Sequence, residues 1–369
     1  MTTPPAVPFV DLRPGEDEAE VRNAIERVLR RGWFVLGPEV EAFEAEFAAA
    51  CGARFAVGVA NGTDAIALAL RAAGIRAGDE VLVPAVTAAF TGLAVVMAGA
   101  APVVVDVEPG TLTIDVDACA AAITPRTRAI VPVHLYGQPA DGDAVQALAD
   151  RHGLAVVEDC AQAHLATDRG RPVGTRGVAG TFSFYPTKNL GALGDGGAVI
   201  TSDPALADRL RRLRNGGQRE RYLHEEAGVN SRLDELQAAV LRARLPRLAG
   251  LTARRRALAA EYRARLDPSV TPIPERDPGH VYHLFPVRTA RRDALRAHLR
   301  AAGVETLVHY PVPLSSQPAF RPYSPGPCPV ADRACGELLS LPLYPGMGVA
   351  DVARVADAVN AFEKGQTIA

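Results

Sequence analysis

The sequence predicts an α/β fold in which helices flank a mostly parallel central sheet, with a smaller α+β domain at the C-terminus. From residue 38 onward, short apolar runs alternate with helical stretches, a pattern typical of parallel strands buried on both faces. The pattern changes near residue 231, where a long helical segment begins. A chain of 369 residues is long enough for one large core and a second, smaller one.

We predict a large domain over residues 1–245 and a smaller α+β domain over residues 246–369. The N-terminal segment, residues 1–35, is expected to pack on the smaller domain.

The elements of the large domain are expected in regular alternation. PEVEAFEAEFAAACG should be a helix, because Pro38 stands at its start and Val40, Phe43 and Phe47 follow at helical spacing. After it we expect strands at 53–60, 79–84, 101–107, 128–134, 154–159, 181–185 and 197–202. Helices are expected at 61–74, in a stretch ending at Gly99, and at 115–122 and 143–152.

The C-terminal part reads differently. Residues 231–266 predict a long helix with a break or kink at Pro246. A proline-rich segment over 267–280 leads to a strand at 280–288. Helices are expected at 291–303 and 349–364.

Composition excludes several classes of protein. Lys and Arg number 40 against 42 Asp and Glu, a formal net charge of -2, so there is no overall field for binding nucleic acid. No segment approaches 18 uncharged apolar residues, and the N-terminus has no signal-like pattern, which predicts a cytoplasmic protein without a membrane span. The five cysteines match no zinc spacing, so we expect free thiols and no metal site.

Polar residues follow three of the predicted strands. In NGTDA, the backbone N–H groups of Gly62 and Thr63 at a helix start suit a phosphate, although an ordinary helix cap is the alternative. Asp159 ends the most apolar strand, where a structural ion pair is the alternative. Lys188 lies between an apolar run and a row of glycines, which favours a desolvated, nucleophilic amine over a solvated one.

The three groups should meet, because open α/β sheets bind ligands beyond the carboxyl ends of their strands. Pyridoxal 5′-phosphate needs all three: an anion cradle, an acid at the pyridine nitrogen and a lysine that forms an imine. No GxGxxG follows a strand and GxxxxGK[ST] is absent, so dinucleotide and P-loop binding lose their main support.

The chain resembles the DegT/StrS-type pyridoxal-phosphate-dependent sugar aminotransferases, which have the fold type I aminotransferase architecture. The resemblance covers nearly the whole length and rests on NGTDAIALAL, VVEDCAQAH, SFYPTKNLGALGDGG, GVNSRLDELQAAVLRARL and VHYPVPL.

The resemblance implies a role for individual residues. Lys188 and Asp159 would be catalytic, as the imine-forming lysine and the partner of the pyridine nitrogen. Asn230 would reach the cofactor phosphate of a neighbouring subunit, which implies a homodimer with shared active sites. The cofactor would contact Gly62, Thr63, Phe90, Asp159, Gln162, Ser183, Lys188 and Asn230, and the substrate Tyr185, His309, Tyr310 and Ser315.

Two positions depart from the family pattern. Ala88 stands where members usually have an aromatic residue stacked on the cofactor ring, so either Phe90 takes over or the ring lacks this platform. Ser315 replaces a histidine associated with the sugar pocket.

The activity implied is transfer of an amino group from L-glutamate to a nucleotide-linked keto-6-deoxyhexose, with dTDP as the expected nucleotide and sugar C-3 as the expected position. A C-4 sugar aminotransferase and an aminocyclitol aminotransferase are alternatives. A sugar dehydratase of this fold would carry histidine at position 188. A non-enzymatic regulatory protein that binds pyridoxal phosphate is the alternative from a different class.

The high Ala and Arg content is typical of GC-rich genomes, where antibiotic-sugar pathways are common.

Overall fold

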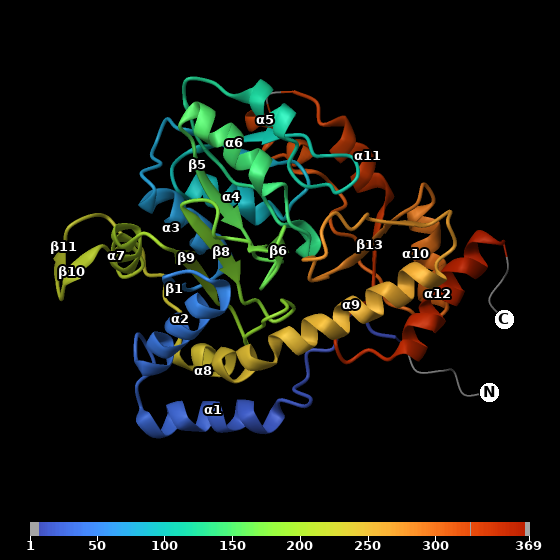
Figure 1. Cartoon of the computed structure of the whole chain (residues 1–369), viewed down its shortest axis with the longest axis horizontal. Coiled ribbons are helices and arrows are strands. Elements are labelled where there is room, and N and C mark those ends of the chain that lie inside the picture. Colours follow the sequence, from blue (N-terminus) through green and yellow to red (C-terminus); the bar gives the residue numbers. More distant parts are fainter. Residues whose placement is uncertain (1–6, 325, 366–369) are drawn as a thin grey trace.

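A seven-stranded sheet forms the centre of the described part of the chain, in a computed structural model that describes residues 7–324 and 326–365 (Figure 1). Strand β9 runs antiparallel to both of its neighbours, whereas the other neighbouring pairs are parallel. The predicted mostly parallel sheet is therefore confirmed. The strands, in sheet order, are β1 (Phe55–Val59), β9 (Gly197–Thr201), β8 (Ala179–Ser183), β5 (Ala155–Asp159), β4 (Thr127–Ile130), β2 (Glu80–Pro84) and β3 (Ala101–Val105).

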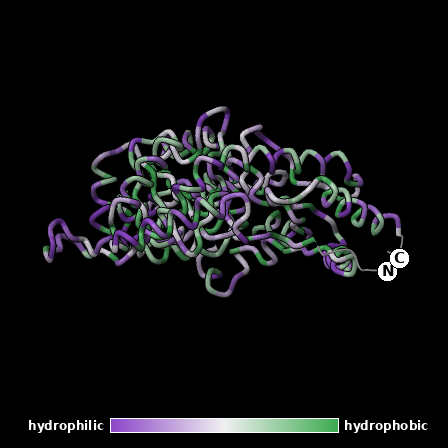
Figure 2. Tube along the Cα trace, turned by 90° about the horizontal axis from the view of Figure 1, so that it is seen from below, coloured by the Kyte–Doolittle hydropathy of each residue, from purple (hydrophilic) through white to green (hydrophobic). Residues whose placement is uncertain are grey.

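Helices cover both faces of this sheet. Because successive strand residues point to opposite faces, Val81 and Val83 pack in the core on one side while Leu82 packs in the core on the other. Figure 2 shows the apolar segments gathered inside the body and the hydrophilic ones towards its rim. The first face carries α3 (Gly62–Ala72), α4 (Ala89–Met97) and α7 (Pro204–Leu213); the second carries α2 (Pro38–Cys51), α5 (Val116–Ala122), α6 (Gly142–His152) and α8 (Glu235–Arg244).

A second core lies at the other end of the molecule (Figure 1). Its sheet has the order β12–β13–β14, and helix α9 reaches it from the large body after a short turn at Pro246, where the sequence predicts a break. The division of the chain near residue 245 stays a prediction. The elements are α9 (Leu248–Arg265), β12 (Thr271–Pro272), β13 (Phe285–Arg288), α10 (Arg292–Ala301), α11 (Pro329–Glu337), β14 (Leu338–Leu341) and α12 (Val349–Glu363).

The N-terminal segment contacts both units. Val7 pairs with Val304 of the C-terminal unit, whereas α1 (Glu18–Arg31) packs through Val28 on Ala239 of α8. Residues 1–6 of the predicted segment lie outside the described residues. Among the residues that the structure describes, no helix has both the length and the apolar character needed to cross a bilayer.

The strand predicted at 280–288 is shorter than expected, because only Phe285–Arg288 pairs as β13. The residues before it bond instead to a turn of the large unit. Val281 N donates to Gly137 O at 3.0 Å, and Leu284 N donates to Tyr136 O at 3.3 Å. This contact forms the seam between the two units.

A two-stranded hairpin, β10 (Gln218–Glu220) and β11 (Leu223–His224), projects from the body beside α7 (Figure 1). Its tip carries Tyr222, which is 79% exposed. Figure 2 shows this projection as mostly hydrophilic chain.

Candidate active site

An anion cradle forms where β1 and β8 end and β9, the strand between them, begins. Gly197 of β9 pairs with both Val59 of β1 and Ser183 of β8, so the chain after β1 meets the end of β8. A Cβ on Gly62 would lie 2.7 Å from Ser183 Cβ, which only glycine avoids. Asn61 caps helix α3 by accepting from Asp64 N at 2.8 Å. The two preceding N–H groups, from Gly62 and Thr63, have no acceptor among the described residues and suit a phosphate.

Asp159 lies at the end of β5 and is 5% exposed. Its Oδ2 accepts from Thr91 Oγ1 at 2.9 Å and its Oδ1 from Ala161 N at 3.1 Å. Burial raises the pKa of this carboxyl above its usual range, although both hydrogen bonds and the charge of Lys188 act in the opposite direction. Thr91, whose hydroxyl also lies 2.8 Å from Thr87 Oγ1, was not among the residues identified from the sequence.

Lys188 stands in the loop that connects β8 to β9. A turn holds its backbone, because Lys188 N donates to Tyr185 O at 2.8 Å. Its Nζ makes no hydrogen bond with the described residues. Burial lowers the pKa of this amine to about 8, while the charge of Asp159 acts against that shift. About a tenth of the amine is therefore uncharged at pH 7, far more than for a solvated lysine, and the uncharged form is the one that a nucleophile or base requires.

Gln162 joins the large unit to the C-terminal one. Its Oε1 accepts from Tyr136 N at 2.6 Å, and its Nε2 donates to Tyr310 OH at 3.0 Å. The Tyr136 hydroxyl in turn donates to the backbone oxygen of His309. Burial raises the pKa of Tyr310 to about 12, so its hydroxyl keeps its proton. The structure thus brings Gln162, His309 and Tyr310 together, and Tyr136 is a further member that sequence reasoning missed.

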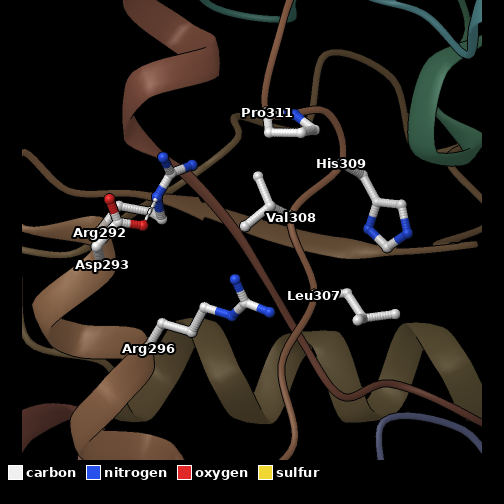
Figure 3. Close-up of a pocket in the computed structure, with 7 residues that line it drawn as sticks. All are labelled: Arg292, Asp293, Arg296, Leu307, Val308, His309 and Pro311. Atoms are coloured by element: carbon white, nitrogen blue, oxygen red, sulfur yellow. Dashed lines mark hydrogen bonds and ion pairs between the residues drawn. The ribbon is translucent and has the colours of Figure 1, made fainter.

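His309 is a neutral imidazole. Its Nδ1 lies 3.0 Å from Ser340 Oγ, and burial together with the charge of Lys188 lowers its pKa to about 4. The segment around it also lines a cavity of about 320 Å³ beside Arg292 and Arg296 of α10 (Figure 3). None of Lys188, Asp159 or Gln162 lines that cavity, so it is distinct from the cradle and its acid–amine pair.

Four predicted residues lie outside this hydrogen-bonded group. Phe90, the second residue of α4, is 62% exposed, and Tyr185 is also exposed. Ser315 belongs to a short turn whose Leu314 N donates to Ala85 O at 2.7 Å, just beyond β2. Asn230 is exposed.

Ser231, the neighbour of Asn230, reaches the cradle within the same chain. Ser231 Oγ accepts from Ala60 N at 3.0 Å and donates to Asp64 Oδ2 at 2.6 Å. It contacts the chain on both sides of Asn61 and supports the start of α3. A serine followed by a long helical segment offers no sequence signal for this role.

His134, Glu158 and Cys160 lie close enough together to resemble a metal site. Backbone groups already use their ligand atoms, because Glu158 accepts from several N–H groups and His134 Nδ1 accepts from Ala140 N at 3.0 Å. The cluster is a structural hydrogen-bond network. All five cysteines are buried and unpaired.

Comparison with known proteins agrees with this geometry. The model of the DegT/DnrJ/EryC1/StrS aminotransferase family matches residues 15–360. A dTDP-3-amino-3,4,6-trideoxy-alpha-D-glucose transaminase of Streptomyces venezuelae is 54% identical over 362 residues, which are 96% of each chain. The crystal structure of S. venezuelae DesV superposes with a TM-score of 0.93 at 53% identity, covering 97% of this chain and 98% of that one. NtdA of Bacillus subtilis, solved with bound cofactor PMP, gives a TM-score of 0.91 at 31% identity, covering 99% and 86%. The chain belongs to the DegT/DnrJ/EryC1/StrS aminotransferase family.

Proposed function

We propose that the protein is a pyridoxal-phosphate-dependent aminotransferase that moves an amino group from L-glutamate to C-3 of a dTDP-linked keto-deoxyhexose. The observation that carries this proposal is the meeting of an anion cradle, a buried carboxyl and a desolvated lysine at one edge of the sheet. Among common cofactors, pyridoxal phosphate is the one that uses all three.

The residues present fit this cofactor. The free N–H groups at Gly62 and Thr63, with the Ser183 hydroxyl beside them, would hold the phosphate. Asp159 receives two hydrogen bonds although its two oxygens can accept more, so it keeps capacity for a protonated ring nitrogen. Lys188 would bond the cofactor covalently, and Gln162 would lie near the ring hydroxyl.

Pyridoxal phosphate, when bound, supplies an electron sink that eases removal of a proton from the carbon next to an amine. The protein supplies the proton transfer and the charge. A Lys188 amine with a pKa of about 8 can accept a proton at Nζ and return it near neutral pH. The Asp159 carboxylate stabilises positive charge opposite it, in a buried setting where such interactions are strong.

The sugar position is argued from the relatives. The S. venezuelae transaminase is named for a 3-amino sugar and is similar along nearly its whole length. A panel of dTDP-linked 3-keto and 4-keto sugars and keto-cyclitols, incubated with L-glutamate and followed by mass spectrometry, tests this choice. Product from the 4-keto sugar or the cyclitol alone would overturn it.

We further propose a homodimer in which each subunit completes the partner's site. Asn230 is exposed, as a residue that serves another subunit must be. The projecting hairpin ends in the exposed Tyr222, and Trp33, Phe34 and Met97 are further exposed apolar side chains that a second copy would cover.

The activity is tested first with Lys188→Ala. We expect turnover to disappear while the far-ultraviolet circular dichroism spectrum stays unchanged, because the substitution removes one side chain from a site and none from the core. The wild-type protein should show a visible absorption band that borohydride bleaches. A band without turnover on any substrate of the panel would favour the regulatory-protein alternative.

The shared site is tested by mixing inactive Lys188→Ala subunits with weakened Asn230→Ala subunits. One site of each mixed dimer would carry both defects and the other neither, so activity should rise above that of either parent. Mixed dimers that form without any recovery would show that Asn230 serves its own subunit.

A further inference from the structure

Asn189, the residue directly after Lys188, connects the loop that carries Lys188 to the C-terminal unit by hydrogen bonds. This loop, residues 184–196 between β8 and β9, is called the lysine loop below. It is 9% exposed. Its Nδ2 donates to Val281 O at 3.0 Å, and its Oδ1 lies 3.3 Å from His283 Nδ1. Both partners belong to the segment before β13 that forms the seam between the two units. The reactive amine is therefore one residue away from an anchor on the other unit.

The hydrogen bonds of this pair define the protonation of His283. The Val281 carbonyl requires the amide nitrogen of Asn189, so the amide oxygen must face His283 Nδ1. Burial, aided by the charges of Lys188 and Arg255, lowers the pKa of His283 well below its usual value, so the ring is neutral. Its proton must then sit on Nδ1, which donates to Asn189 Oδ1.

A buried arginine also holds the seam segment. Arg255 Nη1 of α9 donates to the carbonyl oxygens of Tyr282 at 3.2 Å, His283 at 3.3 Å and Leu343 at 2.8 Å. Arg255 is 5% exposed and has no carboxylate partner among the described residues, and burial lowers its pKa to about 10. A buried charge is costly unless hydrogen bonds compensate it, so these three carbonyls keep a defined position.

The rest of the lysine loop has different anchors. Gly191 O accepts from Arg244 Nη1 at 2.6 Å, and Leu193 N donates to Gln237 Oε1 at 2.8 Å, both from α8. These contacts hold the part of the loop that follows Leu190. Nearer to Lys188, the Leu190 side chain is buried in the core, and the hydrogen bonds to other segments are those of Asn189.

We propose that Asn189 and His283 form a positioning pair that holds Lys188 in its buried place, so that the C-terminal unit controls the surroundings of the reactive amine. Without the pair, the loop would move away from the seam and water would reach Nζ. The consequence is a better-hydrated, more basic amine, because hydration favours the charged form. The proposal rests on the assignment of Lys188 as the reactive amine.

The reactivity of Lys188 can be measured by chemical labelling of lysines, because the only lysines of the sequence are Lys188 and Lys364. The full-length protein is freed of cofactor and labelled with isotopic acetic anhydride across a range of pH, and both lysine peptides are quantified by mass spectrometry. Lys364 is the internal reference. In the wild-type protein, labelling of Lys188 should reach its midpoint near pH 8.

Two substitutions of His283 separate the roles of its nitrogens. An asparagine amide can place its N–H near the position of Nδ1, whereas a glutamine amide reaches the position of Nε2. We expect His283→Asn to keep the wild-type profile. Both His283→Gln and Asn189→Ala should raise the midpoint by half a pH unit or more, which slows Lys188 labelling at neutral pH about threefold.

Arg256→Ala is the matched control. Arg256 Nε donates to His280 O at 2.9 Å, so this variant loosens the same segment without touching Asn189. It should lower the melting temperature and leave the Lys188 profile unchanged. Profiles unchanged in folded His283→Gln and Asn189→Ala would overturn the proposal, as would an equal shift in Arg256→Ala. Labelling needs no turnover, so an inactive wild-type protein with the expected profiles would contradict the proposed function and leave the positioning pair standing.

Discussion

Glu158 and Asp159 are neighbours in β5, both buried, and their surroundings move their acidities in opposite directions. Glu158 accepts from the backbone N–H groups of Gly174, Arg176 and Gly177 at 2.9, 2.8 and 3.1 Å, and from His134 Nε2 at 3.1 Å. Burial alone would raise its pKa, but these donors lower it overall. Asp159 has two donors, and burial raises its pKa.

The difference separates a structural carboxylate from a functional one. Successive residues of a strand face opposite sides, so Glu158 points to one side and Asp159 to the other. The first carboxylate has its acceptor sites filled by the protein and contributes to folding. The second is left with unused acceptor capacity and a charge that is poorly compensated, which costs stability until a cationic partner arrives.

The largest expected effect is the loss of activity in Asp159→Asn. The substitution keeps the shape of the side chain and removes the charge that would face the ring nitrogen. We expect kcat to fall by roughly 10²- to 10³-fold, as when other preorganised electrostatic groups are removed. Steady-state kinetics and the cofactor content of the purified variant measure this. A near-normal rate with full cofactor content would show that another group supplies the charge.

Glu158→Gln should produce the opposite outcome, a loss of stability with little loss of activity. Two of its four donors would face an amide N–H₂ group instead of an oxygen, because each carboxylate oxygen accepts from two of them, so the free energy of unfolding should fall by roughly 2–4 kcal/mol. Urea unfolding of the cofactor-free protein measures this, with Asp159→Asn as the matched variant. The folded enzyme should keep its kcat within about twofold. A larger loss of kcat than of stability would place Glu158 in the site.

The two carboxyls should also differ in how stability depends on pH. The lowered pKa of Glu158 means that it stabilises the fold above about pH 4.5 and that this contribution disappears as pH falls. The raised pKa of Asp159 means that the folded protein gains stability when this group takes up a proton. Between pH 7 and about pH 3, stability should therefore fall less steeply than in the wild type for Glu158→Gln and more steeply for Asp159→Asn. Each tenfold difference in acidity between the folded and unfolded protein is worth about 1.4 kcal/mol. Urea midpoints at several pH values test this, and slopes equal to that of the wild type would refute it.

The smallest expected effect belongs to Thr91→Val. It removes one of the two donors of Asp159 and should raise the pKa of that carboxyl further. We expect kcat/KM to fall by roughly five- to tenfold, which corresponds to the contribution of one hydrogen bond of ordinary strength. Thr87→Val is the control, because Thr87 contacts Thr91 and not Asp159. Equal losses in both variants would show that the effect comes from packing.

Residues that end strands were predictable from the sequence. Asp159, Lys188 and the Gly62–Ser183 cradle each follow an apolar run, and a parallel sheet brings such ends to one edge. The order of the elements and the break at Pro246 follow from periodicity and proline chemistry in the same way.

Contacts between distant segments were not predictable. Thr91, Tyr136 and Ser231 reach the site through pairings that no local pattern encodes. His283 stood inside an expected strand, and its segment bonds to the seam because two carbonyls of the large unit are available there. Phe90 and Asn230 are exposed in the single chain. The partners proposed for them are a cofactor and a second subunit, so contacts within one chain do not test these two predictions.

Because β9 runs antiparallel to β8, the lysine loop begins and ends at neighbouring positions of the sheet. Because Ser183 pairs directly with Gly197, residues 184–196 leave the sheet and return to it at a single rung. An insertion or deletion in this loop would move Lys188 without shifting the register of any strand. Phe184, Leu190 and Ala192 of this loop are buried in the core, so a replacement loop would have to keep these side chains while the residues between them vary.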